Sequence, residues 1–465
     1  RVLGYADVRS GSGDISVLAH GNLQTFGTAD LVTGGSGALD LQSSTGSILL
    51  SPNGVYSSGS GDIRLYAGTD IYLGALIETG GGVSLTAQSG SILESTSSSA
   101  VDVRAGSLRL VAGAGVGRLG ANVDAIETDV NTISARVGAG GLNVLESDAL
   151  LVGSVTVQSR RVGTDGISSD NSDPLQSDLV SNNGGSLVAR TLAGDLIVLD
   201  GAGPEDGVGV STAISGNILL EALGTGSSVS LIADIEGTTG SISIIGALNV
   251  TTTGVASVRT GGSGSVDIAA LGGSVTLSPT SDQEAEAGDI RIYAASNVTL
   301  GGVARTQGTV SLLAVNGWVR DGDTDGSVDI EADSLRFEAR RWVGQLGVND
   351  NAIETTIGRV GGEAGHEGIT ILETDALEVN SVSSIINRVQ SDASTVSVVD
   401  EQRDEIVTRE NGSVVVRTVW GDITLNGGDP AAIRAFGPSV GEGHILLEAG
   451  GEDSSIYMNR SVISN

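Results

Sequence analysis

The sequence predicts an all-β protein: a parallel β-helix, or β-solenoid, made of tandem 227-residue units that hold about nine coils each. Three observations support this prediction. The chain repeats itself at one fixed offset, short segments of alternating apolar residues recur every 20 to 25 residues, and Gly, Ser, Asn and Asp precede those segments. The sequence has no helical pattern of useful length.

The repeat is a tandem duplication. The segment "GDIRLYA" at Gly61 returns as "GDIRIYA" at Gly288, and "LESDAL" at Leu145 returns as "LETDAL" at Leu372. Both pairs lie 227 residues apart, so no net insertion separates them. We therefore divide the chain into 1–11, the end of a preceding repeat, then repeat 1 at 12–238 and repeat 2 at 239–465. We interpret the whole as a window of a longer array.

Each coil starts at a Gly-rich corner and continues into a strand with one buried face. Segments such as "GDISVLA", "GALDLQS" and "GGVSLTA" place apolar residues at every second position, which is the period of a strand. Gly, Ser, Asn and Asp before them suit a tight corner. A second strand pattern follows in each period, as in "GSILLSP" at Gly46. The coils of repeat 1 start at Gly13, Gly37, Gly61, Gly81 and Gly106.

Stacking these coils predicts a continuous core of inward Val, Ile, Leu and Ala. At a strand spacing of about 4.8 Å per coil, one repeat would rise about 43 Å. The rival fold is a set of β-sandwich domains, which typically span about 100 residues and bury a Trp or Tyr. Trp318, Trp342 and Trp420 have no Trp counterpart in repeat 1, so we favour the solenoid.

The composition excludes several classes of partner. The 465 residues carry a formal net charge of −32, with 71 Gly, no Cys and 3% aromatic residues. An acidic surface repels nucleic acid, so we expect no nucleic-acid partner. No apolar run approaches the roughly 18 residues that cross a bilayer, so we expect no membrane insertion in this segment. The 39% hydrophobic content argues against disorder.

The coils of form G-x-I-x-L-x-A resemble the haemagglutinin-type β-helix of bacterial filamentous haemagglutinins and related large secreted adhesins. The block N-x-x-AIET followed by LExDAL, at 122–150 and 349–377, is similar to segments of very large repetitive bacterial surface proteins. The resemblance implies an extracellular place at the bacterial cell surface and an adhesive or structural role. It transfers no catalytic residue.

The stretch "DGDTDG" supplies a candidate metal site. Three alternate Asp residues followed by Gly match the first half of a calcium loop, in which oxygen ligands converge on a hard cation. The final Glu of that template is replaced by Ala332, and repeat 1 reads "ESTSSS" from Glu94 at the equivalent place. The alternative is an acidic solvated corner. The candidate calcium ligands are Asp321, Asp323, Asp325 and Asp329. No other cofactor is expected.

The long corner between Arg161 and Gly185, and its counterpart in repeat 2, must extrude from the coil. Such a loop could bind cations, a neighbouring filament or a host partner, or it could be a tolerated insertion. Acidic residues recur at equivalent places in the two copies. The candidate interaction residues are Asp165, Asp173 and Asp178 in repeat 1, with Asp392, Asp400 and Glu405 in repeat 2.

We expect no enzymatic activity. A polysaccharide-active β-helix enzyme needs paired carboxylates with aromatic platforms, and aromatic residues are scarce here. The sequence has no nucleophile motif and no His cluster with metal-ligand spacing. A cluster of Arg340, Arg341 and Trp342 could contact an anionic glycan, but repeat 1 reads "VAGAGVG" there, which favours a lone surface patch.

The predicted function is an extracellular structural or adhesive rod, a segment of a long repetitive fibre, stalk or sheath. A solenoid lengthens by adding coils without redesigning its core. The alternative is a receptor- or glycan-binding adhesin module that works through the long corners. The expected partners are further copies of the repeat, in the same chain or stacked end to end, laterally associated filaments, and a cell-surface or glycan partner.

Overall fold

A computed structural model describes residues 7–202, 206–323, 326–347, 351–437 and 443–464. The chain divides into two compact units. The first comprises Arg1–Gly224, Ala233–Thr238 and Gln390–Ser394, and the second comprises Thr225–Ile232, Thr239–Val389 and Thr395–Asn465. The described residues contain no helix that is long and apolar enough to span a membrane.

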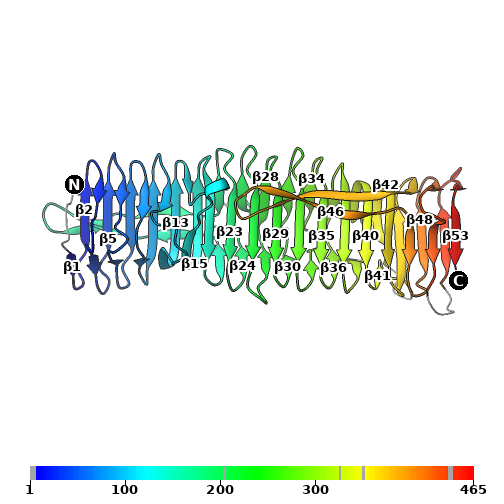
Figure 1. Cartoon of the computed structure of the whole chain (residues 1–465), viewed down its shortest axis with the longest axis horizontal. Helices are drawn as coiled ribbons and strands as arrows, with labels where there is room; N and C mark the ends of the chain where they lie inside the picture. The colour runs from blue at the N-terminus through cyan, green and yellow to red at the C-terminus, as the bar shows by residue number, and fades with distance from the viewer. Residues whose placement is uncertain (1–6, 203–205, 324–325, 348–350, 438–442, 465) are drawn as a thin grey trace. The chain divides into compact units, whose positions relative to one another are not determined.

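Three ladders of parallel strands build the coils of the first unit (Figure 1). Each strand pairs with the equivalent strand of the next coil, as when Ile15 pairs with Leu39 and Leu39 with Ile63. The first ladder is β1 (Val8–Ser10), β4 (Leu31–Thr33), β7 (Tyr56–Ser57) and β10 (Ile77–Glu78). The second is β2 (Ile15–Ala19), β5 (Leu39–Ser43), β8 (Ile63–Ala67) and β11 (Gly82–Ala87). The third is β3 (Leu23–Gln24), β6 (Ile48–Leu49), β9 (Ile71–Leu73), β12 (Ile92–Glu94) and β14 (Gly115–Val116).

The second unit has the same construction. One ladder is β31 (Val258–Thr260), β34 (Gln283–Ala285) and β37 (Ala304–Arg305). The next is β29 (Ile242–Gly246), β32 (Val266–Ala270), β35 (Ile290–Ala294) and β38 (Thr309–Ala314). The last is β30 (Val250–Thr252), β33 (Val275–Thr276), β36 (Val298–Leu300), β39 (Val319–Asp321) and β41 (Trp342–Val343). The predicted all-β parallel solenoid is therefore confirmed.

Stacked aliphatic side chains form the core, because alternate strand residues point inward. In the first unit one inward row carries Leu41, Leu65, Leu85, Leu110 and Ala135, all buried. The row at the same positions of the second unit carries Ile268, Ile292, Leu312, Phe337 and Gly362. Each buried Leu or Ile contributes roughly 2 kcal/mol through loss of apolar surface to solvent.

The corner glycines let successive coils approach each other. A Cβ atom on Gly61 would lie 2.2 Å from the carbonyl oxygen of Gly37, and one on Gly288 would lie 2.1 Å from that of Gly264. Neither Gly61 nor Gly288 has a positive φ. The sequence pattern suggests that Gly occupies these corners because it can adopt a positive φ. In the structure, Gly61 and Gly288 are instead needed because any side chain would collide with the backbone of the preceding coil.

One long strand in each unit reorganises the ladders. In the first unit β13 (Val103–Ala112) pairs with β15 (Ile126–Val137), and β15 then pairs with three separate strands. These are β16 (Gly141–Glu146), β17 (Leu150–Val152) and β22 (Leu179–Ser181). In the second unit β40 (Ile330–Ala339) and β42 (Ile353–Ala364) take the places of β13 and β15, and β42 pairs with β43 (Gly368–Glu373), β44 (Leu377–Val379) and β47 (Ile406–Thr408). The distinctive AIET…LExDAL block is the sequence of this junction.

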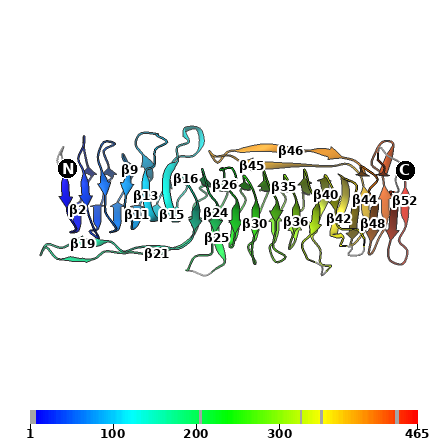
Figure 2. The ribbon, with the colours of Figure 1, turned by 90° about the horizontal axis from the view of Figure 1, so that it is seen from below.

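The long corners fold into antiparallel hairpins. In the first unit β18 (Val155–Val157) pairs with β21 (Asp173–Gln176), and β19 (Arg160–Val162) pairs with β20 (Ser168–Asp170). This hairpin contacts β2, β5, β11, β13 and β15. In the second unit β45 (Val382–Val389) pairs with β46 (Thr395–Arg403), and β45 contacts β29, β32, β35, β38, β40 and β42. Figure 2 shows both hairpins running across the coil strands of their own units.

Candidate functional site

A cluster of three acidic side chains lies at the junction of each unit. In the first unit Glu94, Asp102 and Glu127 each place a carboxylate oxygen within 4.8 Å of the others. In the second unit Asp321, Asp329 and Glu354 do the same. Each member of one cluster lies 227 residues from its equivalent in the other. We name these trios the first and the second acidic triad.

The junction positions the triads in the same way. Asp102 directly precedes β13, and Asp329 directly precedes β40. In each triad the backbone amide of the Glu on the next long strand donates a hydrogen bond to this Asp. This bond joins Glu127 N to Asp102 Oδ2 at 3.2 Å and Glu354 N to Asp329 Oδ2 at 2.9 Å. Glu94 ends β12 and Asp321 ends β39. The third ladder thus places Glu94 or Asp321 next to the other two acids of its triad.

Several triad oxygens are buried without a hydrogen-bond donor. Within the described residues Oε2 of Glu127, Oδ2 of Asp321 and Oε2 of Glu354 accept no hydrogen bond. Asp321 is only 4% exposed and Glu127 only 9%. An unpaired buried carboxylate oxygen is costly, so such a group needs either a proton or a cation.

Burial and mutual repulsion raise the pKa values of the triads. In the first triad burial, followed by the charge of Glu94, raises the pKa of Asp102 to about 8 and that of Glu127 to about 7. In the second triad burial, followed by the charge of Asp321, raises the pKa values of Asp329 and Glu354. Without a counterion each triad therefore retains protons near neutral pH.

The second triad contains two of the four predicted calcium ligands, Asp321 and Asp329. Asp323 donates its backbone amide to Asp321 Oδ1 at 2.9 Å, and Asp325 lies outside the described residues. The calcium-loop pattern does not include Glu354, which comes 25 residues after Asp329, and it does not reach any member of the first triad. The signal that could have found both triads is three acids recurring together at the 227-residue offset.

Glu146 and Glu373, from the LExDAL motif, are fully buried at the junction and are surrounded by hydrogen-bond donors. Glu146 accepts a hydrogen bond from Thr128 Oγ1 at 2.7 Å and from the amide of Val130 at 3.1 Å. Glu373 accepts from Thr355 Oγ1 at 2.6 Å and from the amide of Ile357. Burial raises the pKa of Glu146, and it raises the pKa of Glu373 to about 7.

A buried ion-pair network docks each hairpin. In the first unit Arg64 lies between Asp40, 3.3 Å away, and Asp173 of the hairpin, 3.1 Å away. Asp40 is fully buried and also pairs with Arg161 of the hairpin at 2.6 Å. The hairpin amide of Gln158 donates to Asp62 at 2.6 Å. These bonds join hairpin residues to coil residues that lie far from them in the sequence.

The second unit repeats this network. Arg291 lies 3.4 Å from Asp267 and 3.1 Å from Asp400, and Arg388 pairs with Asp267. The hairpin amide of Ile385 donates to Asp289 at 2.8 Å. Docking is therefore a property of the repeat and not of one copy.

The six predicted interaction residues lie in different environments. Asp173 and Asp400 point toward the coils and join the docking networks. Asp178 is buried and accepts from Ser177 Oγ at 2.7 Å, while Glu405 pairs with Arg434. The other two remain close to solvent near the hairpin turns: Asp165 accepts from the amide of Ile167, and Asp392 from that of Ser394.

The Arg340–Trp342 cluster is an ordered surface of the second unit. Trp342 stacks on Trp318 with ring centroids 5.1 Å apart, and Arg320 lies over the Trp318 ring. Arg341 pairs with Glu367 at 2.5 Å and Arg340 with Glu410 at 3.0 Å. The guanidinium groups are thus already neutralised by carboxylates of the chain.

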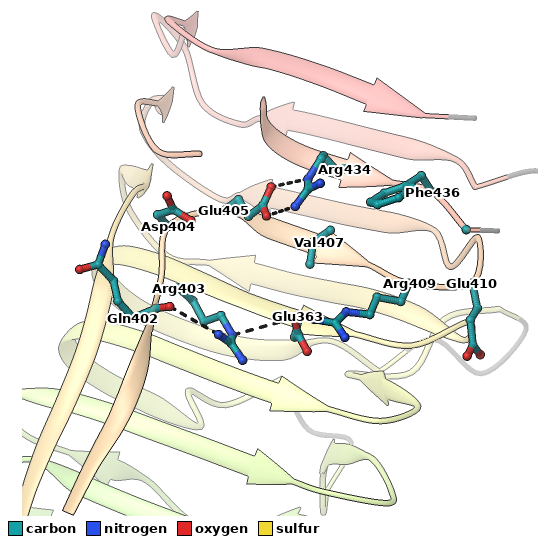
Figure 3. A pocket seen from close by; sticks show the side chains of 11 residues that line it. Glu363, Gln402, Arg403, Asp404, Glu405, Val407, Arg409, Glu410, Arg434 and Phe436 are labelled. Atoms are coloured by element: carbon teal, nitrogen blue, oxygen red, sulfur yellow. Dashed lines mark hydrogen bonds and ion pairs between the residues drawn. The ribbon is translucent and has the colours of Figure 1, made fainter. Parts of the chain in front are cut away.

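A charged groove of about 680 Å³ lies beside the second hairpin. Figure 3 shows that its charges pair with one another: Arg434 binds Glu405, and Arg403 faces Glu363. Arg434 also lies over the ring of Phe436. In the first unit Ser211 takes the strand position of Arg434, and Ala213 follows that strand where Phe436 follows its own, so the groove is particular to the second unit.

No protein family, curated protein or solved structure matches this chain. The triads, the docking network and the hairpins are therefore interpreted from their own geometry.

Proposed function

We propose that the chain is a segment of an extracellular structural or adhesive fibre at a bacterial surface, of the filamentous-haemagglutinin type. The observation that carries this proposal is that junction, triad, hairpin and docking network recur as a set in both units. A repeat that contains all of its own stabilising contacts can be added to an array without any change to the core of its neighbours. The acidic surface, with a net charge of −32, keeps such elements soluble and apart.

Electron microscopy with averaging on the native material tests this proposal. Long filaments with an axial period near about 43 Å, the rise of about nine coils, are the expected result. Short isolated particles without periodic continuation would contradict it.

The second candidate function is binding through the outer face of the hairpin. Ile385 and Val399 face each other across β45 and β46 and are 55% and 61% exposed. Replacing both by Thr changes this face and leaves the inward Arg388 and Asp400 in place. Loss of cell or glycan adhesion with unchanged unfolding temperature would favour a binding module over a purely structural element.

A further inference from the structure

We propose that each acidic triad is a calcium site, so that the chain binds two Ca²⁺ ions, one at Glu94, Asp102 and Glu127 and one at Asp321, Asp329 and Glu354. This inference goes beyond the proposed function and does not depend on it. It also differs from the loop site predicted from "DGDTDG", since only Asp321 of its six ligands lies in that stretch and a whole second site lies elsewhere.

The geometry suits a single ion. Oxygens that share a Ca²⁺ at 2.3–2.6 Å can lie at most about 5 Å apart. All three oxygens of each triad lie within 4.8 Å of one another. They come from two ladders of the coil and from the junction strand, which are fixed by parallel pairing, so the distances are built into the fold.

The unpaired oxygens point to a ligand. Asp321 Oδ2 and Glu127 Oε2 are buried and accept no hydrogen bond within the described residues. In the described part of the chain, no ion pair joins any of the six acids to an Arg; the nearby Arg118 instead pairs with Asp124. The charge of Glu127 acts on Arg190, but Leu145 lies between the two in the stacked row and no ion pair joins them in the described part of the chain. A divalent cation would supply the missing positive charge.

The donor set selects the kind of cation. Carboxylate oxygens without His or Cys favour the hard ions Ca²⁺ and Mg²⁺ over transition metals. Mg²⁺ dehydrates reluctantly and keeps several of its waters, whereas Ca²⁺ accepts more protein oxygens in a flexible geometry. Five of the six triad acids are buried, which leaves little room for those waters, so the larger ion fits better.

The experiment titrates CaCl₂ into the metal-free 465-residue chain by isothermal calorimetry. The test variants are Asp102→Asn, Asp329→Asn and both together, because Asn keeps the acceptor for the amide of Glu127 or Glu354 while removing the charge. The matched control is Asp165→Asn with Asp392→Asn, which removes the same two charges from the hairpins. We expect two Ca²⁺ per chain for wild type and control, one for each single variant and none for the double variant.

Thermal unfolding in EDTA and in millimolar CaCl₂ gives a second readout. Calcium should raise the midpoint of wild type and control by several degrees and leave the double variant unchanged. If either Asn variant fails to fold, Glu127→Gln and Glu354→Gln should give the same loss of one ion each. Two ions still bound to the double variant, or none bound to wild type at millimolar calcium, would overturn the sites. Equal affinity for MgCl₂ would overturn the assignment to calcium.

Discussion

Phe337 and Gly362 stack in neighbouring coils at the positions where repeat 1 places Leu110 and Ala135. The larger ring in one coil is matched by the smaller residue in the next. A Cβ atom added to Gly362 would lie 2.5 Å from the Phe337 ring and 2.5 Å from the Phe337 carbonyl oxygen. The two copies thus fill the same inward row with different side chains at similar total volume, which cores tolerate well.

Gly362→Ala should therefore lower the free energy of unfolding by about 1–3 kcal/mol through overpacking. Phe337→Leu alone should also destabilise, because it leaves a cavity. The double variant should be more stable than the sum of the two single effects predicts, since it recreates the pair of repeat 1. Urea unfolding of all four proteins measures this coupling. Strict additivity would show that the two positions do not compensate.

Glu373 should make stability depend on pH. Its folded-state pKa is raised to about 7 from 4.5, so between those values the folded chain holds a proton that the unfolded chain has lost. Stability from this group is then highest below about pH 4.5 and falls as pH rises to about 7, by up to about 3 kcal/mol. Glu373→Gln should remove that share of the slope.

Urea unfolding between about pH 5 and pH 7.5 in EDTA measures the slope for wild type and Glu373→Gln. The control is Glu401→Gln, because the Glu401 side chain is 90% exposed. A slope that is the same in all three proteins would assign the pH dependence to other groups.

At the scale of the element, the hairpin is held by few but buried charges. Asp40→Asn removes the carboxylate shared by Arg64 and Arg161, which should cost roughly 3 kcal/mol and loosen the hairpin. Limited trypsin digestion should then cleave after Arg160 and Arg161 several times faster than in wild type. Asp170→Asn changes an exposed hairpin carboxylate and is the control. Faster cleavage throughout the chain would instead indicate general unfolding.

The strand ladders could be predicted from the sequence, whereas the docked hairpins and most of the acidic triads could not. Alternation of apolar residues from Gly13 onward identifies strands because a buried face imposes period two. The hairpins are visible in the sequence only as long corners, since their docking partners, such as Asp40 for Arg161, lie 121 residues away. The second triad is predictable in part because Asp321 and Asp329 lie in one loop. Glu354 is not, because it arrives through the next coil.

At the scale of the whole molecule, charge should govern association. With a net charge of −32, copies repel one another in EDTA, and millimolar calcium should screen that repulsion and raise light scattering. The double variant Asp102→Asn with Asp329→Asn should respond in the same way, because the response arises from the exposed surface. Scattering unchanged by calcium would argue against lateral association. A response lost only in the double variant would place its origin in the triads.

The docked hairpins also bear on how such a chain can lengthen over generations. Arg161 must meet Asp40, and Arg388 must meet Asp267, so a hairpin is useful only when its dock is inherited with it. Unequal exchange between two copies aligned at the full 227-residue offset preserves every such pair wherever the crossover falls. Slippage by a single coil would leave a hairpin facing the wrong strand. The heritable unit must therefore contain the hairpin together with its dock, which lie 121 residues apart, so a single coil is too small.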